Sequence, residues 1–181
     1  MERAVRGVIA FIGVGSNLGE PTDACLEAVK RVAELPKTRF LRRASLYRTE
    51  PVGPQDQAWF INTIIEVRTD LESCELLTAL QGIEKVMGRS EGRRWGPRVI
   101  DLDILLYGSQ VLSEEGVTIP HPEFHRRAFV LVPLAEIAPY VIHPAFGVSV
   151  QGLLDRLEER GAVELLPEPL DPETAPEMLG C

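Results

Sequence analysis

Strand-like and helix-like segments alternate along the chain in an order that few folds accommodate. The strand-like segments are residues 8–14, 40–47, 60–67 and 99–107, and the amphipathic, helix-like segments are residues 21–35 and 71–87. The resulting order is strand, helix, strand, strand, helix, strand, which is the split βαβ arrangement of ferredoxin-like folds. We therefore predict an α+β fold in which helices pack on the faces of an antiparallel sheet.

The length of the chain fits one domain with a sizeable core. The 181 residues are 45% hydrophobic and 25% charged, and two complete domains would be cramped at this length. We assign residues 1–161 to a single domain, with a third helix near residues 153–157. Residues 162–181 are rich in proline and glutamate, and we expect a C-terminal tail that packs weakly or against a neighbouring molecule. We expect a monomer or a weak homo-oligomer.

The charge balance limits the classes of partner. The chain has 19 Lys and Arg against 27 Asp and Glu, and its formal net charge of -8 argues against broad attachment to nucleic acid or anionic lipid. No apolar run approaches the roughly 20 residues that a membrane span needs. Residues 1–7 also lack a signal-peptide pattern. We therefore expect a cytoplasmic protein that acts on small molecules, with no nucleic acid and no membrane as partner.

The three cysteines are Cys25, Cys74 and Cys181. They are widely spaced, odd in number and form no CxxC pair, which indicates reduced thiols. Because Cys25 and Cys74 lie in segments with a helical pattern, we expect both to be small core residues and not catalytic ones.

Asp101 and Asp103 lie in the most informative of the strand-like segments. Because side chains alternate along a strand, both carboxylates are expected to project from one face, opposite an apolar face. The apolar face would consist of Ile100, Leu102, Ile104 and Leu106. Two adjacent carboxylates beside a hydrophobic strand repel each other, so Mg²⁺, which prefers oxygen ligands, is a natural partner. Alternatively, the two aspartates lie on a solvated face or pair with nearby arginines.

Four arginines precede this aspartate pair in a chain that is acidic overall. They are Arg89, Arg93, Arg94 and Arg98. Guanidinium groups bind phosphate oxygens through paired hydrogen bonds, so cations beside two carboxylates indicate a site for a metal ion and a polyphosphate. The alternative is a solvated run of charge. Trp95 lies among these arginines, and we expect it to cover a bound ligand.

Two further motifs fit cofactor or metal sites less well. Residues 13–19 contain three glycines, but the third is one position later than in the dinucleotide-binding pattern, so a tight strand-to-helix turn is favoured. His121 and His125 have a spacing sometimes used for zinc, but Pro120 and Pro122 resist a helix that would align the rings. We expect this segment to present one imidazole to a ligand.

A set of short motifs occurs in a single order along the chain. They are GSNLG at residues 15–19, YRT at 47–49, GPQDQ at 53–57, FIN at 60–62, RWGPRVIDLD at 94–103, PHP at 120–122 and RAF at 127–129. Together they resemble the hydroxymethyl-dihydropterin pyrophosphokinase family. The resemblance runs from about residue 9 to residue 144, and RWGPRxxDLDI is its most specific part. It implies transfer of pyrophosphate from ATP to 6-hydroxymethyl-7,8-dihydropterin, with release of AMP, in folate biosynthesis.

The resemblance also implies roles for individual residues. Asp101 and Asp103 would bind two Mg²⁺ ions that bridge the ATP phosphates and the pterin hydroxyl. The catalytic arginines would be Arg89, Arg94 and Arg98. The pterin site would consist of Thr49, Val52, Phe60, Asn62, Trp95 and Phe129, with the heterocycle between the two phenylalanines. The ATP site would consist of Gln81, Glu84, Arg98, Ile104, Thr118, His121 and Arg127.

Two rival functions stay open. A small-molecule kinase that transfers only the γ-phosphate would use similar carboxylates and arginines, and it would release ADP in place of AMP. A non-catalytic ferredoxin-like binding module would explain the fold but would leave Asp101, Asp103 and the arginines without a role.

Overall fold

A computed structural model describes residues 7–89, 96–114, 116–158 and 160–167. Within these residues six strands form an antiparallel sheet in the order β5-β1-β4-β3-β8, and β2 pairs with β4 alongside β3. The strands are β1 (Val8–Ser16), β2 (Thr38–Arg43), β3 (Tyr47–Thr49), β4 (Phe60–Thr69), β5 (Asp101–Tyr107) and β8 (Val163–Leu165). Two further strands, β6 (Leu112–Glu114) and β7 (Val117–Ile119), form a separate hairpin.

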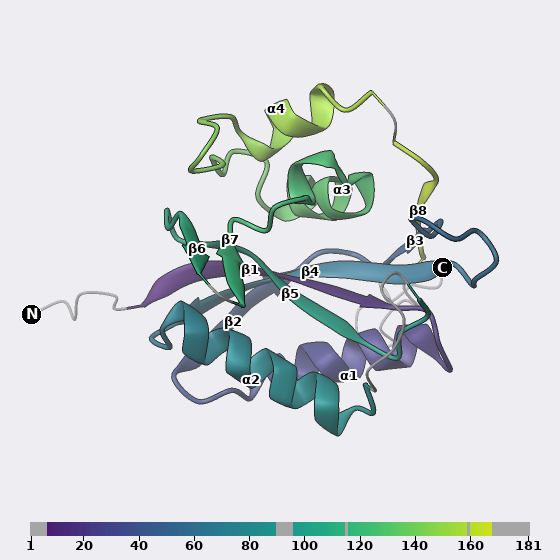
Figure 1. The fold of residues 1–181 in the computed structure, drawn as a ribbon, viewed down its shortest axis with the longest axis horizontal. Coiled ribbons are helices and arrows are strands. Elements are labelled where there is room, and N and C mark those ends of the chain that lie inside the picture. The colour runs from purple at the N-terminus through teal and green to yellow at the C-terminus, as the bar shows by residue number, and fades with distance from the viewer. Residues whose placement is uncertain (1–6, 90–95, 115, 159, 168–181) are drawn as a thin grey trace, which may run out of the picture.

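Helices cover both faces of the sheet (Figure 1). The helices are α1 (Pro21–Ala33), α2 (Ser73–Val86), α3 (Ala128–Ile137) and α4 (Val150–Asp155), with a 3-10 turn, η1, at Phe124–Arg126. We call the two sides of the sheet the α1/α2 face and the α3/α4 face. No helix of the described residues is long and apolar enough to cross a membrane.

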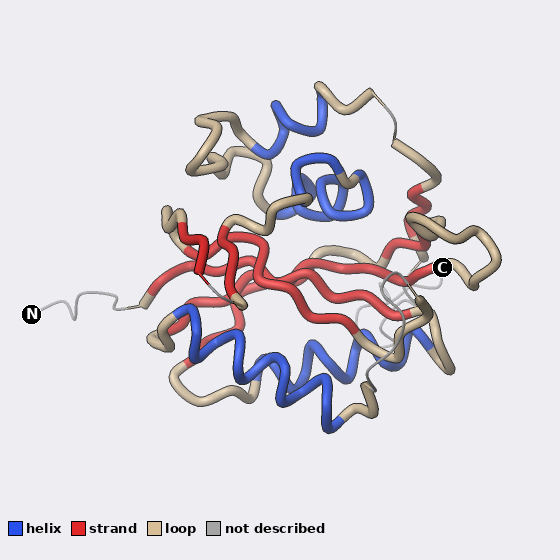
Figure 2. Tube along the Cα trace, viewed as in Figure 1, coloured by secondary structure: helices blue, strands red, loops and turns tan. Residues whose placement is uncertain are grey.

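The predicted α+β architecture is confirmed. Each βαβ unit contributes one central strand, because β1 and β4 pair with each other and lie between β5 on one side and β2 and β3 on the other. Figure 2 shows this sheet between two layers of helix. The second helix, α2, starts at a capping box, in which the Glu72 backbone N–H donates to the Glu75 carboxylate at 2.8 Å.

Separate hydrophobic clusters lie on the two faces. Ala10, Ile12 and Val14 of β1 pack with α1 and α2, whereas Phe11 packs with α3 and α4. Because both faces are buried, β1 is a nearly continuous apolar run and does not alternate between apolar and polar residues. The sequence therefore predicted the strand but not which of its side chains lie on which face of the sheet.

The strand predicted at residues 40–47 is two strands, so this prediction is wrong in its boundaries. The pairing register of β2 with β4 shifts between Phe40 and Arg42, and the chain leaves the ladder after Arg43. Ala44 then contacts β4 irregularly, with its N–H donating to the Ile64 carbonyl at 2.9 Å. β3 starts only at Tyr47.

The continuous apolar face predicted for β5 is also interrupted. Ile100, Leu102 and Ile104 of the predicted apolar face lie together on the α1/α2 face, as expected. The register of β1 with β5 shifts between Phe11 and Ile12, and Leu106 consequently lies on the α3/α4 face. The prediction for Leu106 is wrong, while the aspartates precede the shift and keep their expected side.

Elements after residue 107 were the hardest to predict. The helix predicted near residues 153–157 is α4. It starts earlier than expected, because the Ser149 side chain caps it by accepting a hydrogen bond from the Gly152 N–H at 3.0 Å. The sequence interpretation did not identify α3, which is apolar on nearly all sides, contains Pro133 and so has no amphipathic stripe. It also missed the β6–β7 hairpin.

Part of the expected C-terminal tail belongs to the sheet. β8 pairs with β3, and Leu166 packs against the hydrophobic cluster of the α1/α2 face. Residues 168–181 lie outside the described part of the chain, and the boundary at residue 161 stays a prediction. Cys25 is buried as expected, but Cys74 is exposed on α2, so its prediction as a core residue is wrong.

Candidate active site

A cavity of about 620 Å³ lies between the α3/α4 face of the sheet and the start of α3. β1, β4 and β5 form its floor, and residues 49–52 and 121–130 contribute its walls. Gly13 and Gly15 lie on this floor, and a Cβ atom at Gly15 would come within 2.7 Å of Asn62 Oδ1. The glycine-rich motif therefore lies partly inside β1, where it makes room for a polar side chain of the site.

Asp101 and Asp103 both line the cavity, while Leu102 between them is buried in the core. They pair across the ladder with Gly15 and Gly13 of β1, respectively, so nothing beyond a hydrogen atom covers them from that strand. The expectation that both carboxylates emerge from the same side of one strand is confirmed.

Arginines also reach these carboxylates. Arg89 and Arg98 each place a guanidinium nitrogen close to Asp101 Oδ1, at 3.0 and 2.8 Å. Arg89 additionally pairs with Glu84, a buried residue whose carboxylate accepts the Leu102 N–H at 2.7 Å. Of the alternatives that the sequence left open, pairing with arginines therefore occurs at Asp101, within a cavity that a ligand can enter.

The surroundings of Asp103 raise its proton affinity. Burial raises the pKa of Asp103 to about 7, and the negative charges of Asp101 and Glu84 add to the rise, although Arg127 and Arg89 oppose it. Burial also raises the pKa of Glu84. A divalent cation would reverse this trend, since it favours the ionised form of the carboxylates that it touches.

The carboxylates of Asp101 and Asp103 fit an Mg²⁺ ion that takes its remaining ligands from water and phosphate. Among the described residues no group of three or more His, Cys, Asp or Glu side chains is arranged to hold a metal ion by itself. Asp101 and Asp103 offer two carboxylates, and Mg²⁺ is commonly bound through one or two carboxylates plus water and substrate phosphates. The pair is thus suited to a metal ion that arrives with a phosphorylated ligand.

The opposite end of the cavity is aromatic and amide-lined. Phe60, at the start of β4, and Phe129, near the start of α3, both line it. Asn62 is buried, and its Nδ2 donates to Thr49 Oγ1 at 2.6 Å. This bond leaves Asn62 Oδ1 as an acceptor next to the cavity. A flat heterocycle with N–H groups on one edge would suit these surfaces.

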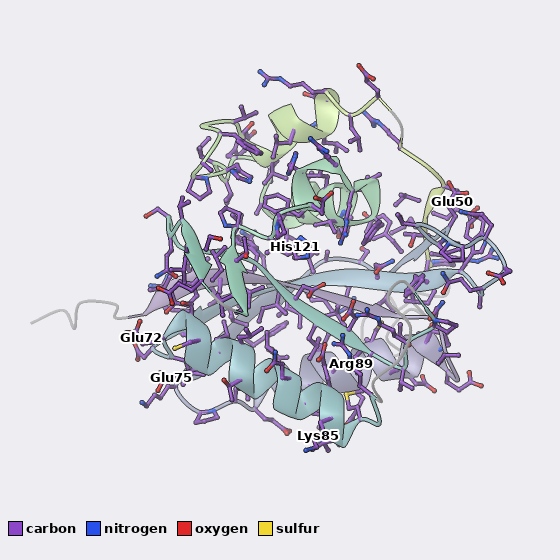
Figure 3. All side chains as sticks on the ribbon, viewed as in Figure 1. Glu50, Glu72, Glu75, Lys85, Arg89 and His121 are labelled. Atoms are coloured by element: carbon purple, nitrogen blue, oxygen red, sulfur yellow. The ribbon has the colours of Figure 1, made fainter. Side chains whose placement is uncertain are left out.

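His121 and Arg127 add polar groups to the lining of the cavity. Figure 3 shows His121 beneath α3. His121 Nδ1 accepts the Glu123 N–H at 3.2 Å, and burial lowers the pKa of this imidazole. A neutral ring with Nδ1 as acceptor carries its proton on Nε2, which can then donate to a ligand. His125 is instead in edge contact with Phe146, with ring centroids 4.9 Å apart, and does not line the cavity. The expectation of one presented imidazole is thus met by His121.

Several residues predicted for the ATP site lie outside the cavity. Gln81 is exposed on α2, Thr118 is exposed on β7 and Ile104 is buried on the α1/α2 face. β5 is an edge strand of the sheet, and both α2 and β7 contact it. The three residues therefore surround the free edge of β5, next to the aspartates but not between the walls of the cavity. Glu84, which was also predicted for the ATP site, is buried on α2 and does not line the cavity either. The contacts of these four residues with ATP stay predictions.

Three of the predicted residues cannot be located. Arg93, Arg94 and Trp95 lie outside the described residues. Of the remaining predictions, the structure brings Thr49, Val52, Phe60, Asn62, Arg89, Arg98, Asp101, Asp103, His121, Arg127 and Phe129 to the cavity.

Some functional positions were not recognised in the sequence. Glu50 and Glu123 line the cavity, and no pattern distinguished them from surface acids. Asn17 was predicted only as part of a strand-to-helix turn. Instead, its Oδ1 accepts the Arg98 N–H at 2.8 Å, and its Nδ2 donates to the Ala58 carbonyl at 3.0 Å. Asn17 thereby fixes the backbone of a site arginine from 81 positions away in sequence.

Comparisons with known proteins identify relatives over most of the chain. Residues 11–139 match the family described as 7,8-dihydro-6-hydroxymethylpterin-pyrophosphokinase (HPPK). A 2-amino-4-hydroxy-6-hydroxymethyldihydropteridine pyrophosphokinase of Haemophilus influenzae is 43% identical over 76% of this chain and 86% of its own length. The protein of the same name in Methylorubrum extorquens is 42% identical over 84% of this chain and 95% of its own length.

Solved structures agree in fold. An HPPK-DHPS triple mutant of Plasmodium falciparum superposes with a TM-score of 0.68 at 15% identity, covering 86% of this chain and 44% of that one. This chain thus spans less than half the length of that solved protein, and the likeness bears on the fold alone. From the match over residues 11–139 and the relatives above 40% identity, the chain belongs to the 7,8-dihydro-6-hydroxymethylpterin-pyrophosphokinase family.

Proposed function

We propose that the cavity is the active site in which the pyrophosphoryl group of ATP passes to the hydroxymethyl group of 6-hydroxymethyl-7,8-dihydropterin, with release of AMP. The chain is accordingly an enzyme of folate biosynthesis, an ATP-dependent pyrophosphokinase. The observation that carries the assignment is one cavity that is lined by Asp101, Asp103 and two arginines and also by the Asn62 amide and the rings of Phe60 and Phe129.

The pterin occupies the aromatic end of this cavity. Its bicyclic ring lies between Phe60 and Phe129, and its pyrimidine edge donates to Asn62 Oδ1 and bonds to backbone groups near Thr49 and Val52. The Asn62–Thr49 bond fixes the amide so that its acceptor faces the ligand. The hydroxymethyl group then points toward Asp101 and Asp103.

Asp101 and Asp103 would hold two Mg²⁺ ions that arrive with the triphosphate. Bound there, the ions supply positive charge that neutralises the phosphates and lowers the pKa of the attacking hydroxyl. Arg89 and Arg98 exchange their bonds to Asp101 for bonds to phosphate oxygens when ATP enters, and Arg94 joins them. These guanidinium groups stabilise the charge that develops on the transferring group.

The transfer itself needs no covalent bond to the protein. The oxygen of the pterin hydroxyl forms a bond with the β-phosphorus of ATP and gives up its proton to solvent, while the bond from the β-phosphorus to the α,β-bridging oxygen breaks and AMP departs with that oxygen. The chain contributes by orientation, since the heterocycle and the triphosphate are held from opposite ends of one cavity. Trp95, which lies outside the described residues, stays a predicted pterin contact, and water must be excluded from the site because it would otherwise hydrolyse ATP.

The rest of the nucleotide lies along the free edge of β5. There it meets Gln81, Ile104 and Thr118, while His121 and Arg127 contact the phosphates from the cavity side. Glu84 acts beneath this site by holding Arg89 and the Leu102 N–H. We further propose that the enzyme works in the cytoplasm as a monomer or weak homo-oligomer, without nucleic acid.

Product analysis tests the function. Purified protein is incubated with Mg-ATP and 6-hydroxymethyl-7,8-dihydropterin, and the nucleotide released is identified by chromatography. AMP in equal amount with a pyrophosphorylated pterin is the expected result. ADP would instead favour transfer of the γ-phosphate, and binding of both ligands without turnover would favour a non-catalytic module.

A further inference from the structure

The wall of the pterin end depends on a very short strand. β3 has three residues, and it is followed by residues 50–59, which form neither helix nor strand. Thr49, the last residue of β3, accepts the hydrogen bond of Asn62 and pairs with Phe60 across the ladder. β4 therefore supports this wall through a ladder of only three residue pairs. Of the two predicted pterin contacts, Thr49 lies at the end of that ladder and Val52 lies beyond it.

The C-terminal segment, residues 160–166, supports this strand from the other side. β8 pairs with β3, with Thr49 opposite Val163. Beyond the ladder, the Glu50 N–H donates to the Ala162 carbonyl at 3.2 Å, and the Ala162 N–H donates to Glu50 Oε1 at 3.0 Å. Figure 3 shows Glu50 close to β8. Glu50 therefore binds the C-terminal segment through both its backbone and its carboxylate.

Gly161 permits this close contact. Its φ angle is +59°, in the left-handed region that glycine adopts without strain. A Cβ atom at this position would lie 2.7 Å from Glu50 Oε1, well inside van der Waals contact. Any larger residue at position 161 would displace the Glu50 carboxylate or the backbone of the segment.

Glu50 also lies between two cavities. It lines the active-site cavity and a second one of about 270 Å³, which is lined by residues 49–52, by residues 123 and 126–129 around the start of α3 and by the C-terminal segment. Gly161 lines only the second cavity. The β3–β8 ladder ends at Thr49, so the Glu50–Ala162 pair is the link that continues past the ladder toward Val52.

We propose that the C-terminal segment positions the pterin-binding wall, and that Glu50 is the positioning residue through which it acts. The proposal rests on the proposed function in that it takes the Thr49 and Asn62 end of the cavity as the pterin site. By holding Glu50, the segment fixes the place of Thr49 and Val52 relative to Phe60. It has no part in the aspartate and arginine end of the cavity.

The first test compares Glu50→Ala with Glu50→Gln by steady-state kinetics. Glu50→Ala should raise KM for the hydroxymethyl pterin roughly five- to tenfold, the loss expected from one partly buried hydrogen bond. Both kcat and KM for ATP should stay within about twofold of wild type, because only binding at one end is affected. Glu50→Gln retains an acceptor oxygen and should restore most of the pterin affinity.

A second variant separates positioning from direct contact of Glu50 with the ligand. Gly161→Ala disturbs the Glu50 carboxylate from outside the active-site cavity and should reproduce the rise in pterin KM. The double variant should show little more than the larger single effect, since both changes break one link. If Gly161→Ala has wild-type kinetics while Glu50→Ala does not, Glu50 touches the pterin itself and the proposal is overturned.

Glu164→Gln is the matched control on the same strand. Glu164 is exposed, and its pairing with Arg48 at 3.5 Å is a surface contact, so the variant should be kinetically silent. Thermal melting of every variant establishes that it is folded. Release of AMP by the wild type tests the proposed function separately. If the wild type releases AMP, two results would overturn the positioning role alone. One is an unchanged KM for the pterin in Glu50→Ala, and the other is a lower kcat together with higher KM values for both substrates.

Discussion

The α1/α2 face and the α3/α4 face of the sheet differ in how completely side chains fill the space above them. On the α1/α2 face, Leu76 and Leu80 of α2 are fully buried against the strands. On the α3/α4 face, α3 and α4 cover only part of the sheet, and a cavity of about 620 Å³ remains over β1, β4 and β5. The open part of that face carries aspartates and arginines where the other carries hydrocarbon.

Neighbouring residues of β5 illustrate what this difference means. Leu102 is buried on the α1/α2 face, and Asp103 next to it lines the cavity. The first is placed to stabilise the fold. The second is held among other carboxylates with a raised pKa, which costs stability in the absence of a cation. Because side chains alternate along a strand, β5 thus presents a core residue on one face and a proposed catalytic residue on the other.

The largest effect is expected at the aspartates. Asp101→Ala or Asp103→Ala should lower kcat by more than about a hundredfold, because the charge that anchors Mg²⁺ and the triphosphate is lost. Turnover is measured as AMP release at saturating Mg²⁺, and circular dichroism checks that the fold is intact. Wild-type rates would place the metal site elsewhere.

The opposite outcome is expected one residue away. Leu102→Ala should lower the free energy of unfolding by about 2–5 kcal/mol, because it leaves a cavity in the filled face. Urea denaturation measures the loss. At a temperature where the variant is still folded, its pterin and ATP KM values should stay near wild type. A loss below about 0.5 kcal/mol would show that the two faces do not divide the work as described.

A smaller effect of opposite sign is expected for Asp103→Asn in the absence of Mg²⁺. The pKa of Asp103 is raised from 3.8 to about 7, so the native state holds a proton that the unfolded chain has released. Its contribution to stability therefore falls as pH rises from about 4 to about 7. The variant should gain stability relative to wild type over this range.

By pH 8 this gain should reach on the order of 1–2 kcal/mol, less than the full shift because Asp103 is only partly buried. Urea denaturation of both proteins at pH 5 and pH 8 measures it. An equal difference at the two pH values would mean that Asp103 titrates as a solvated carboxylate.

The smallest effects are expected at the free edge of β5. Gln81→Ala and Thr118→Ala should each raise KM for ATP about two- to fivefold, since each removes one exposed polar contact. KM for the pterin and the free energy of unfolding should not change, because both residues are exposed and lie outside the cavity. Unchanged KM for ATP in both variants would confine the nucleotide to the cavity.

Local patterns in the sequence predicted the elements of the sheet layer and the shared side of the two aspartates. Alternation along β5 placed Asp101 and Asp103 on one side, and helical spacing located α1 and α2. These patterns failed where long-range pairing decides the outcome. Shifts in the register of β1 with β5 and of β2 with β4 moved Leu106 to the other face and split one strand into two.

Parts of the site were also beyond local patterns. Gly15 matters because Asn62, from a different strand, occupies the space that a side chain would take. Asn17 matters because it binds Arg98 across the fold. In the sequence Glu50 resembles any surface acid, and its role follows from its bond to Ala162 next to β8. Each of these roles arises from a contact between distant segments, for which a single sequence carries no periodic signal.

The most direct measurement is a crystal structure of the protein with Mg²⁺, α,β-methylene ATP and 6-hydroxymethyl-7,8-dihydropterin. We expect two metal ions that bridge Asp101 and Asp103 to the phosphates, with the heterocycle between Phe60 and Phe129 and its hydroxyl facing the β-phosphorus. A nucleotide bound away from the two aspartates, or a heterocycle outside the cavity on the α3/α4 face, would contradict this assignment.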